Sequence, residues 1–328
     1  MGRMIRKTLY LCMSVVLAAL LSLSACANRI CEDNRQAQLS KNASEMEMKR
    51  LHEQQSIWNT DLADDSRFLC DFKLNANEKA VAKKFARTVV ANLSTSDFYV
   101  HYLLTRLKEE NLPIELAAIP MVESGLNPHV KPNGGAHGAW QYMRSTANTL
   151  GLKRTGNYDG IYDFFACTEA SLKYFKHLYE DLGQWDLVAA AYNQGEYGVK
   201  KAMAAVAATG VKPTIDNVKI ARGARQYVTK IKAFSDVMRH PSDYGVTLPL
   251  IKNRSAFKRV DVAGKVHTLN EAARLSGAPI ETLRKLNSGY TGDRIDEHHG
   301  LLLPVEQAEV LEDVLSVTTA EVRRANSK

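Results

Sequence analysis

The sequence lacks the motifs that mark several large enzyme classes. Its 328 residues contain no Walker phosphate-binding loop, no dinucleotide-binding glycine fingerprint and no Gly-x-Ser-x-Gly turn for a serine nucleophile. The five cysteines form no Cys-x-x-Cys and no Cys/His cluster with zinc spacing. The net charge is only +7, and no basic stripe is interleaved with aromatic residues. We therefore expect no cofactor, no metal and no nucleic-acid partner.

Alternating strand patterns are also absent between residues 78 and 238. Apolar residues recur there at helical spacing, which predicts a mainly α domain. The segment 193–197 interrupts this pattern and is predicted to be a loop. The expected helices span residues 78–93, 98–110, 114–121, 145–150, 162–181, 185–192, 198–208 and 224–238.

The composition changes after Pro241. Two strand-like segments flank two short helical patterns, which predicts a βααβ unit that buries little core alone and leans on its neighbour. Its elements are expected at residues 257–262, 269–276, 279–286 and 301–304. The overall expectation is a mainly α (α+β) chain with a leader at 1–25, a tether and N-terminal segment at 26–75, a helical domain at 76–245 and a small unit with a tail at 246–328.

The N-terminus has the pattern of a processing signal. A basic start at residues 3–7 precedes an apolar run over 8–22, which is too short to span a membrane comfortably. Residues 23–26 read Leu-Ser-Ala-Cys and resemble the bacterial lipobox, in which the thiol of Cys26 receives lipid. Ala27 is not an aspartate, so we expect a lipid-anchored chain at the periplasmic face of the outer membrane. The alternatives are an uncleaved anchor and an ordinary secretory signal.

Three further cysteines lie beyond the expected leader and lipidation site. In an oxidising compartment Cys31 and Cys70 could pair, but the sequence does not decide this. Cys167 lies in an apolar helical run, which predicts a small buried hydrophobic residue.

One carboxylate stands out as a candidate for chemistry. Glu123 follows an apolar helical stretch, and the chain breaks directly afterwards at Gly125. A glycine-rich segment at 133–138 and the segment 190–195, Ala-Ala-Tyr-Asn-Gln-Gly, follow. A desolvated carboxyl, a glycine-lined groove and aromatic and amide groups are what a sugar-cleaving cleft with a single acid requires. The alternative is a helix-end glutamate on a solvated face.

These residues share a pattern with a known family. The matching positions are Glu123-Ser124, Pro128, Gly135-Ala136-His137-Gly138, Trp140-Gln141, Met143, Thr146 and Ala191-Tyr192-Asn193-Gln194-Gly195. The combination resembles the lytic transglycosylase (SLT) domain of bacterial cell-wall enzymes, which has a goose-lysozyme-like fold. Because the motifs are separate and keep their spacing, the resemblance is more specific than the Glu-Ser pair alone.

The resemblance implies cleavage of the β-1,4 bond between N-acetylmuramic acid and N-acetylglucosamine in peptidoglycan, without water, to give 1,6-anhydro ends. It makes Glu123 the general acid and then the base. It places Tyr192 and Asn193 opposite Glu123, and Gln141 and Met143 along the sugar subsites. The alternatives are a core tyrosine with a capping asparagine for the first pair, and loop packing for the second.

Two other aromatic residues have less certain roles in this pattern. Tyr227 matches a family tyrosine on the last helix of the domain, where a core role is equally compatible. Trp140 is expected to be a core residue rather than a sugar platform.

The small C-terminal unit resembles a degenerate LysM module. The pattern covers residues 261–264, 269–277, 283–287 and 302–304, but Val266-His267-Thr268 replaces the usual Gly-Asp-Thr turn. LysM modules bind glycans that contain N-acetylglucosamine. Whether this copy binds a glycan or has only a structural role stays open.

Three positions depart from the SLT pattern. Pro132 replaces a frequent serine near the acid, Gly223 replaces a common glutamate, and Arg144 replaces a usual proline in a change expected to be harmless. The first two leave a glycan-binding scaffold with a weakened site as an alternative to the enzyme. A hydrolytic muramidase is the other alternative. The oligomeric state is not determined by the sequence.

Other polar groups are interpreted without catalysis. Asp159 and Asp163 are i and i+4, and we interpret them as a helix-start residue and a cap or salt-bridge partner. His298-His299 beside Asp296-Glu297 is interpreted as a solvated turn rather than a metal site.

Overall fold

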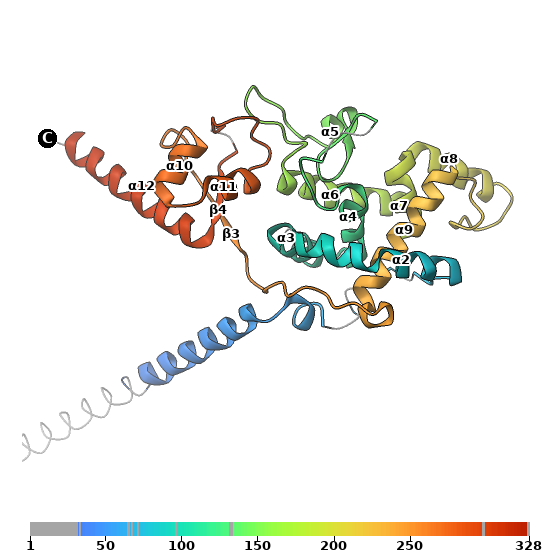
Figure 1. Cartoon of the computed structure of the whole chain (residues 1–328), viewed down its shortest axis with the longest axis horizontal. Coiled ribbons are helices and arrows are strands. Elements are labelled where there is room, and N and C mark those ends of the chain that lie inside the picture. The colour runs from blue at the N-terminus through green and yellow to red at the C-terminus, as the bar shows by residue number, and fades with distance from the viewer. Residues whose placement is uncertain are drawn as a thin grey trace, which may run out of the picture. The chain divides into compact units, whose positions relative to one another are not determined.

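The computed structural model describes residues 32, 34–63, 66, 68–70, 72–95, 97–130, 134–296 and 299–326. The chain divides into two compact units, Met1–Gln55 and Ser56–Lys328. The described part of the first unit includes a helix over residues 34–54 whose side chains are almost all exposed (Figure 1). Within the described residues, no helix combines the length and apolarity needed to cross a membrane.

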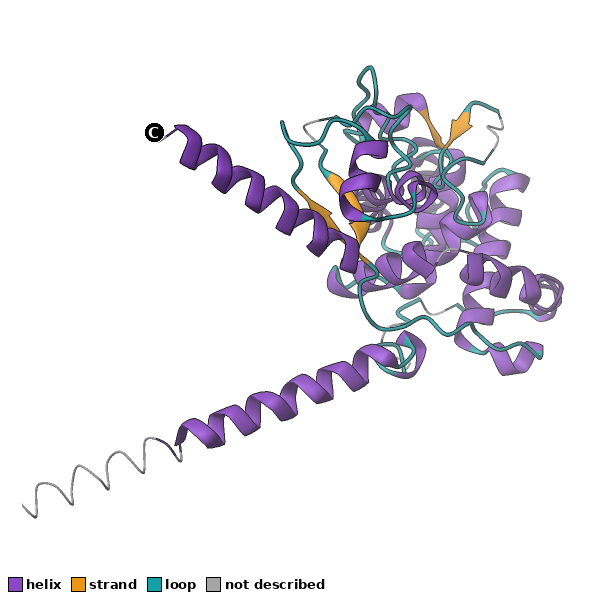
Figure 2. Cartoon of the chain, turned by 60° about the vertical axis from the view of Figure 1, so that its left-hand side comes forward, coloured by secondary structure: helices purple, strands orange, loops and turns teal. Residues whose placement is uncertain are grey.

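The second unit begins with a helical region. Its elements are η1 (Ile57–Asn59), α2 (Ala76–Thr95), α3 (Asp97–Glu109), η3 (Ile114–Ala117), α4 (Ala118–Ser124), β1 (Ala136–His137), β2 (Tyr142–Met143), α5 (Arg144–Thr149), α6 (Phe164–Leu182), α7 (Trp185–Gln194), α8 (Glu196–Ala207), α9 (Arg222–Arg239) and η4 (Pro241–Tyr244). Figure 2 shows helices throughout, so the mainly α prediction is confirmed.

Helix α9 forms the centre of this region. It packs against α2, α4, α7 and η3, which lie far from it in the sequence. Its buried face includes Ile231, Phe234 and Val237 at helical spacing, and all three belong to one core with Leu103 of α3 and Phe175 of α6. The core therefore fixes where α4 and α7, which carry candidate site residues, lie relative to α9.

The C-terminal part contains the predicted βααβ unit. Its elements are β3 (Phe257–Val260), α10 (Leu269–Ser276), α11 (Ile280–Leu286) and β4 (Leu301–Pro304), followed by α12 (Val305–Asn326). Strands β3 and β4 pair antiparallel, with Val260 opposite Leu301. Helix α12 has no counterpart among the predicted elements, and its buried Ala308 and Leu311 join the small second core. As predicted, the unit leans on its neighbour, because Leu286 and Leu302 are buried in the core of the helical region.

Two local predictions were wrong. The segment 193–197 is not a loop, because α7 runs to Gln194 and α8 starts at Glu196. Only Gly195 separates them, with a φ of 94° that a glycine adopts without strain. The predicted absence of strands also fails at β1 and β2, where Ala136 pairs with Met143 across a short antiparallel ladder.

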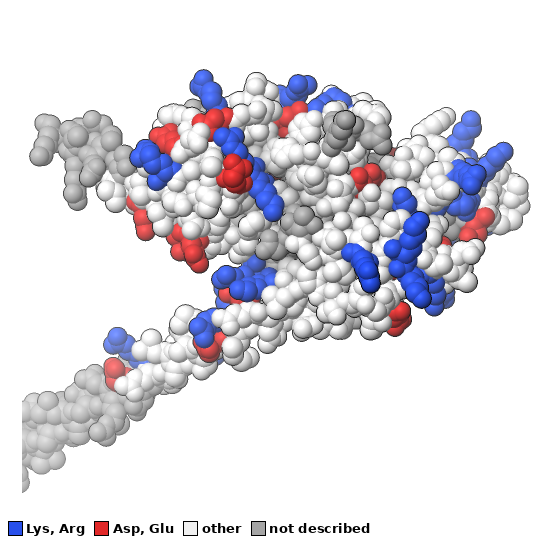
Figure 3. Space-filling model, in the orientation of Figure 1, with Lys and Arg blue, Asp and Glu red and all other residues white. Residues whose placement is uncertain are grey.

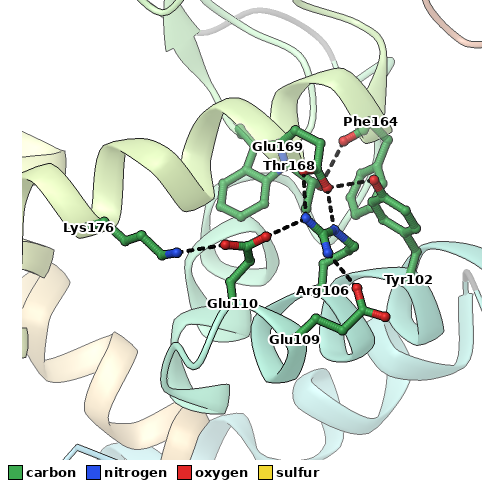
Figure 4. Close-up of polar contacts among 9 residues, drawn as sticks. Tyr102, Arg106, Glu109, Glu110, Phe164, Thr168, Glu169 and Lys176 are labelled. Carbon is green, nitrogen blue, oxygen red and sulfur yellow. Dashed lines mark hydrogen bonds and ion pairs between the residues drawn. The ribbon is translucent and has the colours of Figure 1, made fainter.

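A network of ion pairs joins α3 to α6 (Figure 4). Arg106 on α3 donates from Nε and Nη2 to the two carboxylate oxygens of Glu169 on α6, over 2.7 and 3.0 Å. Glu169 also accepts a hydrogen bond from Tyr102, and Glu110 bridges Arg106 to Lys176. Bidentate geometry and partial burial make such a network stronger than an isolated surface pair.

Arg106→Met should lower the free energy of unfolding by about 2 kcal/mol, because Glu169 and Glu110 both lose their shared cation. Urea denaturation measures the change. Lys176→Met is the matched control, since Lys176 is exposed at the edge of the same network and should contribute less than about 0.5 kcal/mol. Equal effects of the two variants would contradict a central role for Arg106.

Candidate active site

Glu123 lies in the last turn of α4, on a helix that the core holds in place. The preceding η3 residues are all buried, and so are residues 118–121 at the start of α4. Gly125 ends the helix with a φ of 65°, the left-handed conformation in which glycine is favoured. The partly buried Glu123 is therefore carried on fixed structure to the point where the chain leaves the core.

The surroundings of Glu123 favour its protonated form. Burial raises the pKa of the Glu123 carboxyl from 4.5 to about 7. The hydroxyl of Tyr227 and the charge of Lys230 lower the pKa, but by less than burial raises it. Near neutral pH this carboxyl can therefore both donate and accept a proton, as general acid–base catalysis requires.

Tyr192 on α7 and Tyr227 on α9 lie in the same electrostatic environment. Burial raises the pKa of both phenols well above 10, and the charge of Glu123 raises them further. The Tyr192 hydroxyl donates to the carbonyl of Trp140 over 2.6 Å. The Tyr227 hydroxyl is buried and has no hydrogen-bond partner of good geometry among the described residues. Two phenols and one carboxyl from three helices thus form one site.

Residues 134–143, here called the glycine loop, carry the other candidate groups. The Ser124 hydroxyl next to Glu123 donates to the carbonyl of Ala139 over 2.7 Å and so ties this loop to α4. Gly138 has a φ of 74°, and an added Cβ would lie 1.9 Å from the carbonyl oxygen of Ile161. Trp140 is fully buried, as predicted for a core residue.

Gln141, Met143 and Asn193 were predicted to contact sugar. Gln141 has a φ of 50°, which is strained for a residue with a side chain, and its amide donates to the carbonyl of Gly138 over 2.8 Å. Met143 is 48% exposed on β2. Asn193 is exposed near the end of α7. Gln141 and Met143 lie on the glycine loop, which the Ser124 hydroxyl ties to the helix that carries Glu123. Their contact with a substrate stays a prediction.

Lys230 was missed by the sequence analysis. It lies near Glu123, where its charge lowers the pKa of the carboxyl. Its position three residues after Tyr227 on α9 could have indicated it, because residues i and i+3 share a helix face.

Two interpretations of polar residues were wrong. Asp159 does not start a helix, because α6 begins at Phe164 and its cap is Asp163, as predicted for Asp163. The buried carboxylate of Asp159 instead pairs with Arg144. His299 does not lie in a solvated turn, since its ring stacks on Tyr158 with 3.6 Å between centroids. Asp296 beside it is also buried. These groups are structural partners in the folded chain, a role that local polarity does not indicate.

Several predicted features lie outside the described residues: Cys26, Cys31, Pro132, Glu297 and His298. Cys70 and Cys167 are buried free cysteines, as predicted for Cys167. Gly223 has open space beside its Cα.

One group of side chains has the ligand types of a cation site. His177, Asp181 and Glu196 bring their ligand atoms within 4.8 Å of one another between α6 and α8. The ammonium of Lys200 already lies 2.8 Å from Asp181 Oδ2 and 3.3 Å from Glu196 Oε1. The ammonium of one lysine therefore already pairs with both carboxylates of this group.

A hollow of 560 Å³ lies along α8, lined by residues that include Lys201, Val206 and Lys219. On the face shown in Figure 3, acidic and basic side chains are interspersed, and basic side chains gather at the end that carries α8. Glu123 does not line this hollow.

Burial also acts on a second carboxyl. Glu115 of η3 is 2% exposed, and burial raises its pKa to about 7 although the amide of Cys70 donates to it over 2.9 Å. Because the folded chain holds protons on Glu115 and Glu123 that the unfolded chain has lost, stability should fall as pH rises from about 4.5 to above 7.

In Glu115→Gln, the loss of unfolding free energy between pH 5 and pH 8 should be smaller by on the order of 2 kcal/mol, because the amide has no proton to lose in this range. Urea denaturation of both proteins at pH 5 and pH 8 measures the difference. An equally steep decline in the variant would show that Glu115 is not the titrating group.

Comparison with known proteins finds two matching regions, both within Ser56–Lys328. Residues 105–214 match the model of the transglycosylase SLT domain, and residues 256–319 match that of the LysM-like domain of lytic transglycosylase MltD. The membrane-bound lytic murein transglycosylases D of Escherichia coli K12 and of E. coli O6:H1 are each 32% identical over 221 residues, 66% of this chain and 49% of theirs.

The chain thus spans about half the length of these relatives. Both resemblances expected from the sequence are confirmed. Residues 105–214 belong to the transglycosylase SLT domain family, and residues 256–319 belong to the MltD family of LysM-like domains.

Proposed function

We propose that the chain is a peptidoglycan lytic transglycosylase that cleaves the β-1,4 bond between N-acetylmuramic acid and N-acetylglucosamine, with Glu123 as its single acid and base. The observation that carries the proposal is the position of Glu123 inside the SLT match, at the end of a buried helix, with a pKa raised to about 7. The two curated relatives are named as lytic murein transglycosylases.

In the first step, protonated Glu123 gives its proton to the glycosidic oxygen. The bond between that oxygen and the anomeric carbon of the N-acetylmuramic acid breaks. The N-acetylglucosamine leaves with the oxygen as a hydroxyl group. Positive charge then develops on the muramic acid ring, and the substrate's N-acetyl group can stabilise it. The low exposure of Glu123 supports the role of acid, because burial keeps the proton on the carboxyl until the substrate takes it.

In the second step, the C6 hydroxyl of the muramic acid attacks its own anomeric carbon. The carboxylate of Glu123 takes the hydroxyl proton, and a 1,6-anhydro bond forms without water. One carboxyl can serve both steps because the nucleophile is part of the substrate and has a high effective concentration. Tyr192 and Tyr227 stay protonated and therefore uncharged beside Glu123, because burial raises the pKa of both phenols.

Mass spectrometry of digested peptidoglycan tests the proposal. The expected products carry 1,6-anhydromuramic ends. Reducing ends instead would identify a hydrolytic muramidase. Binding without products would favour a glycan-binding scaffold, an alternative that Gly223 and Pro132 keep open because the family's usual polar groups are absent there.

We further infer that the chain is anchored to a membrane by lipid on Cys26. The sequence around Cys26 supports this, and so does the description of both relatives as membrane-bound lytic murein transglycosylases. Cys26→Ala should move the protein from the membrane pellet to the soluble fraction of a cell lysate, because the thiol that receives the acyl chain is removed. Cys70→Ala is the control and should stay in the pellet. A Cys26→Ala protein that still pellets with membranes would overturn the lipid anchor.

A further inference from the structure

Residues 157–162, here called the middle segment, support the glycine loop at three points. The Arg144 guanidinium, directly after β2, donates to both oxygens of Asp159 over 2.7 and 2.9 Å. His137 Nδ1 lies 2.9 Å from the Tyr162 hydroxyl. Gly138 approaches the Ile161 carbonyl so closely that no Cβ would fit. The middle segment therefore contacts the glycine loop at His137 and Gly138 and holds Arg144, the residue directly after the loop.

The middle segment is also held by the LysM-like domain. Its residues 288–291, here called the strap, run beside the middle segment as an extra strand would. The amide of Asp159 donates to the Gly289 carbonyl over 2.7 Å, and the amide of Thr291 donates to the Asn157 carbonyl over 3.0 Å. The Ser288 hydroxyl donates to the Tyr162 carbonyl over 2.7 Å.

The strap fits too closely for a larger residue at its centre. A Cβ added at Gly289 would lie 2.6 Å from Tyr158 Cε2 and 2.9 Å from Asp163 Cβ. Around it, Tyr290 contacts Tyr158 edge to face, and His299 stacks on the same ring. Such aromatic packing and the absence of space indicate a built interface rather than an incidental contact.

The ion pair between Arg144 and Asp159 is strengthened by burial. Asp159 is 3% exposed, and its carboxylate is paired closely with Arg144, whereas the more exposed Arg154 lies 3.7 Å away. Removing one partner of a buried ion pair leaves an uncompensated charge and is strongly destabilising. Arg144, which the sequence analysis expected to be a harmless replacement, is therefore the cation on which the middle segment and the glycine loop both depend.

We propose that the LysM-like domain is a fixed support of the glycine loop, acting through the strap, Asp159 and Arg144. In this role Arg144 and Asp159 are positioning residues, because they hold the loop that carries Gln141 and Met143. The support operates whether or not the LysM-like domain itself binds glycan. The inference rests on the proposed function only where it concerns sugar binding by the loop.

Hydrogen exchange measured by mass spectrometry tests the support without any enzyme assay. Gly289→Ala should speed exchange of the amides in residues 134–143 by at least about tenfold, because the strap is forced away from Tyr158. Gly292→Ala is the matched control in the same domain, since nothing lies within 4 Å of its added Cβ. Faster exchange in the strap alone, with the glycine loop unchanged, would overturn the proposal.

Kinetics with soluble peptidoglycan fragments test the positioning role. Arg144→Met should raise KM by about tenfold and change kcat much less, because the loop moves while Glu123 stays on α4. Arg144→Lys should restore part of the KM, since it keeps the charge but not the bidentate geometry. Arg154→Met, the exposed neighbour on the same carboxylate, should leave both constants unchanged.

The two experiments separate this inference from the proposed function. If no fragment is cleaved by any variant but Gly289→Ala still loosens the glycine loop, the proposed function fails and the structural support stands. If cleavage is normal and Arg144→Met leaves KM unchanged or lowers kcat alone, the positioning role of Arg144 is wrong while the enzyme assignment stands.

Discussion

Replacing Glu123 by glutamine should lower kcat for peptidoglycan cleavage by at least about a thousandfold while leaving the fold intact. Glutamine keeps the volume of the side chain but has no proton to give to the leaving oxygen. The substrate would still bind, because the groups of α7, α9 and the glycine loop are unchanged. Steady-state release of anhydromuramic products, with circular dichroism to check folding, measures the effect.

Glu115→Gln provides a matched control for this substitution. Both carboxyls have a pKa raised by burial to about 7, but Glu115 is 2% exposed within η3 and has no route to a substrate. Its variant should cleave peptidoglycan at close to the normal rate. Retained cleavage by Glu123→Gln, or an equal loss in both variants, would refute the assignment of Glu123 as the single acid.

The pH dependence of cleavage follows from the same carboxyl. The first step needs protonated Glu123, so kcat/KM should fall as pH rises through about 7. A group with an ordinary pKa of 4.5 would place this fall well below neutrality. The position of the decline therefore reports whether burial raises the pKa of Glu123 in solution.

Gly138→Ala should lower the free energy of unfolding by about 3 kcal/mol or more and abolish the native glycine loop. The new Cβ would lie 1.9 Å from the Ile161 carbonyl oxygen, so the backbone itself must move. The φ of 74° adds strain that alanine tolerates poorly. Urea denaturation measures the stability, and proteolysis between residues 134 and 143 reports the loop.

Gly134→Ala separates the two causes. Gly134 also has a positive φ, 60°, but nothing lies within 4 Å of its added Cβ. Its variant should therefore show only the cost of the backbone conformation, about 1 kcal/mol. If Gly138→Ala were no more destabilising than Gly134→Ala, the close approach to Ile161 would not be needed in solution.

Local patterns predicted the helices well where burial on one face repeats with the helical period. The pattern over 269–276 coincides with α10, and that over 224–238 lies within α9. The prediction failed at 193–197, because Asn-Gln-Gly is a typical loop sequence while the folded chain turns on Gly195 alone. A single residue of suitable φ replaced a loop, which periodicity cannot anticipate.

The site was predictable only in part, for a related reason. Glu123, Tyr192 and Tyr227 could be named from motif spacing. Lys230 belongs to no motif, and although it shares a helix face with Tyr227, its effect on Glu123 depends on how the fold places α9 relative to α4. Arg144 was expected to be a harmless replacement for a proline, and His299 was interpreted as part of a solvated turn because its neighbours in sequence are polar. Their real partners, Asp159 and Tyr158, are residues that the fold brings to them.

The sequence by itself determined the helical class of the main domain, the βααβ unit and the identity of the candidate acid, because each depends on local periodicity or on motif spacing. Only the tertiary structure decided the effect of Lys230 on Glu123, the pairing of Arg144 with Asp159 and the docking of the strap on the middle segment. These depend on contacts between segments far apart in the chain, such as 159 with 289, which leave no trace in a local pattern.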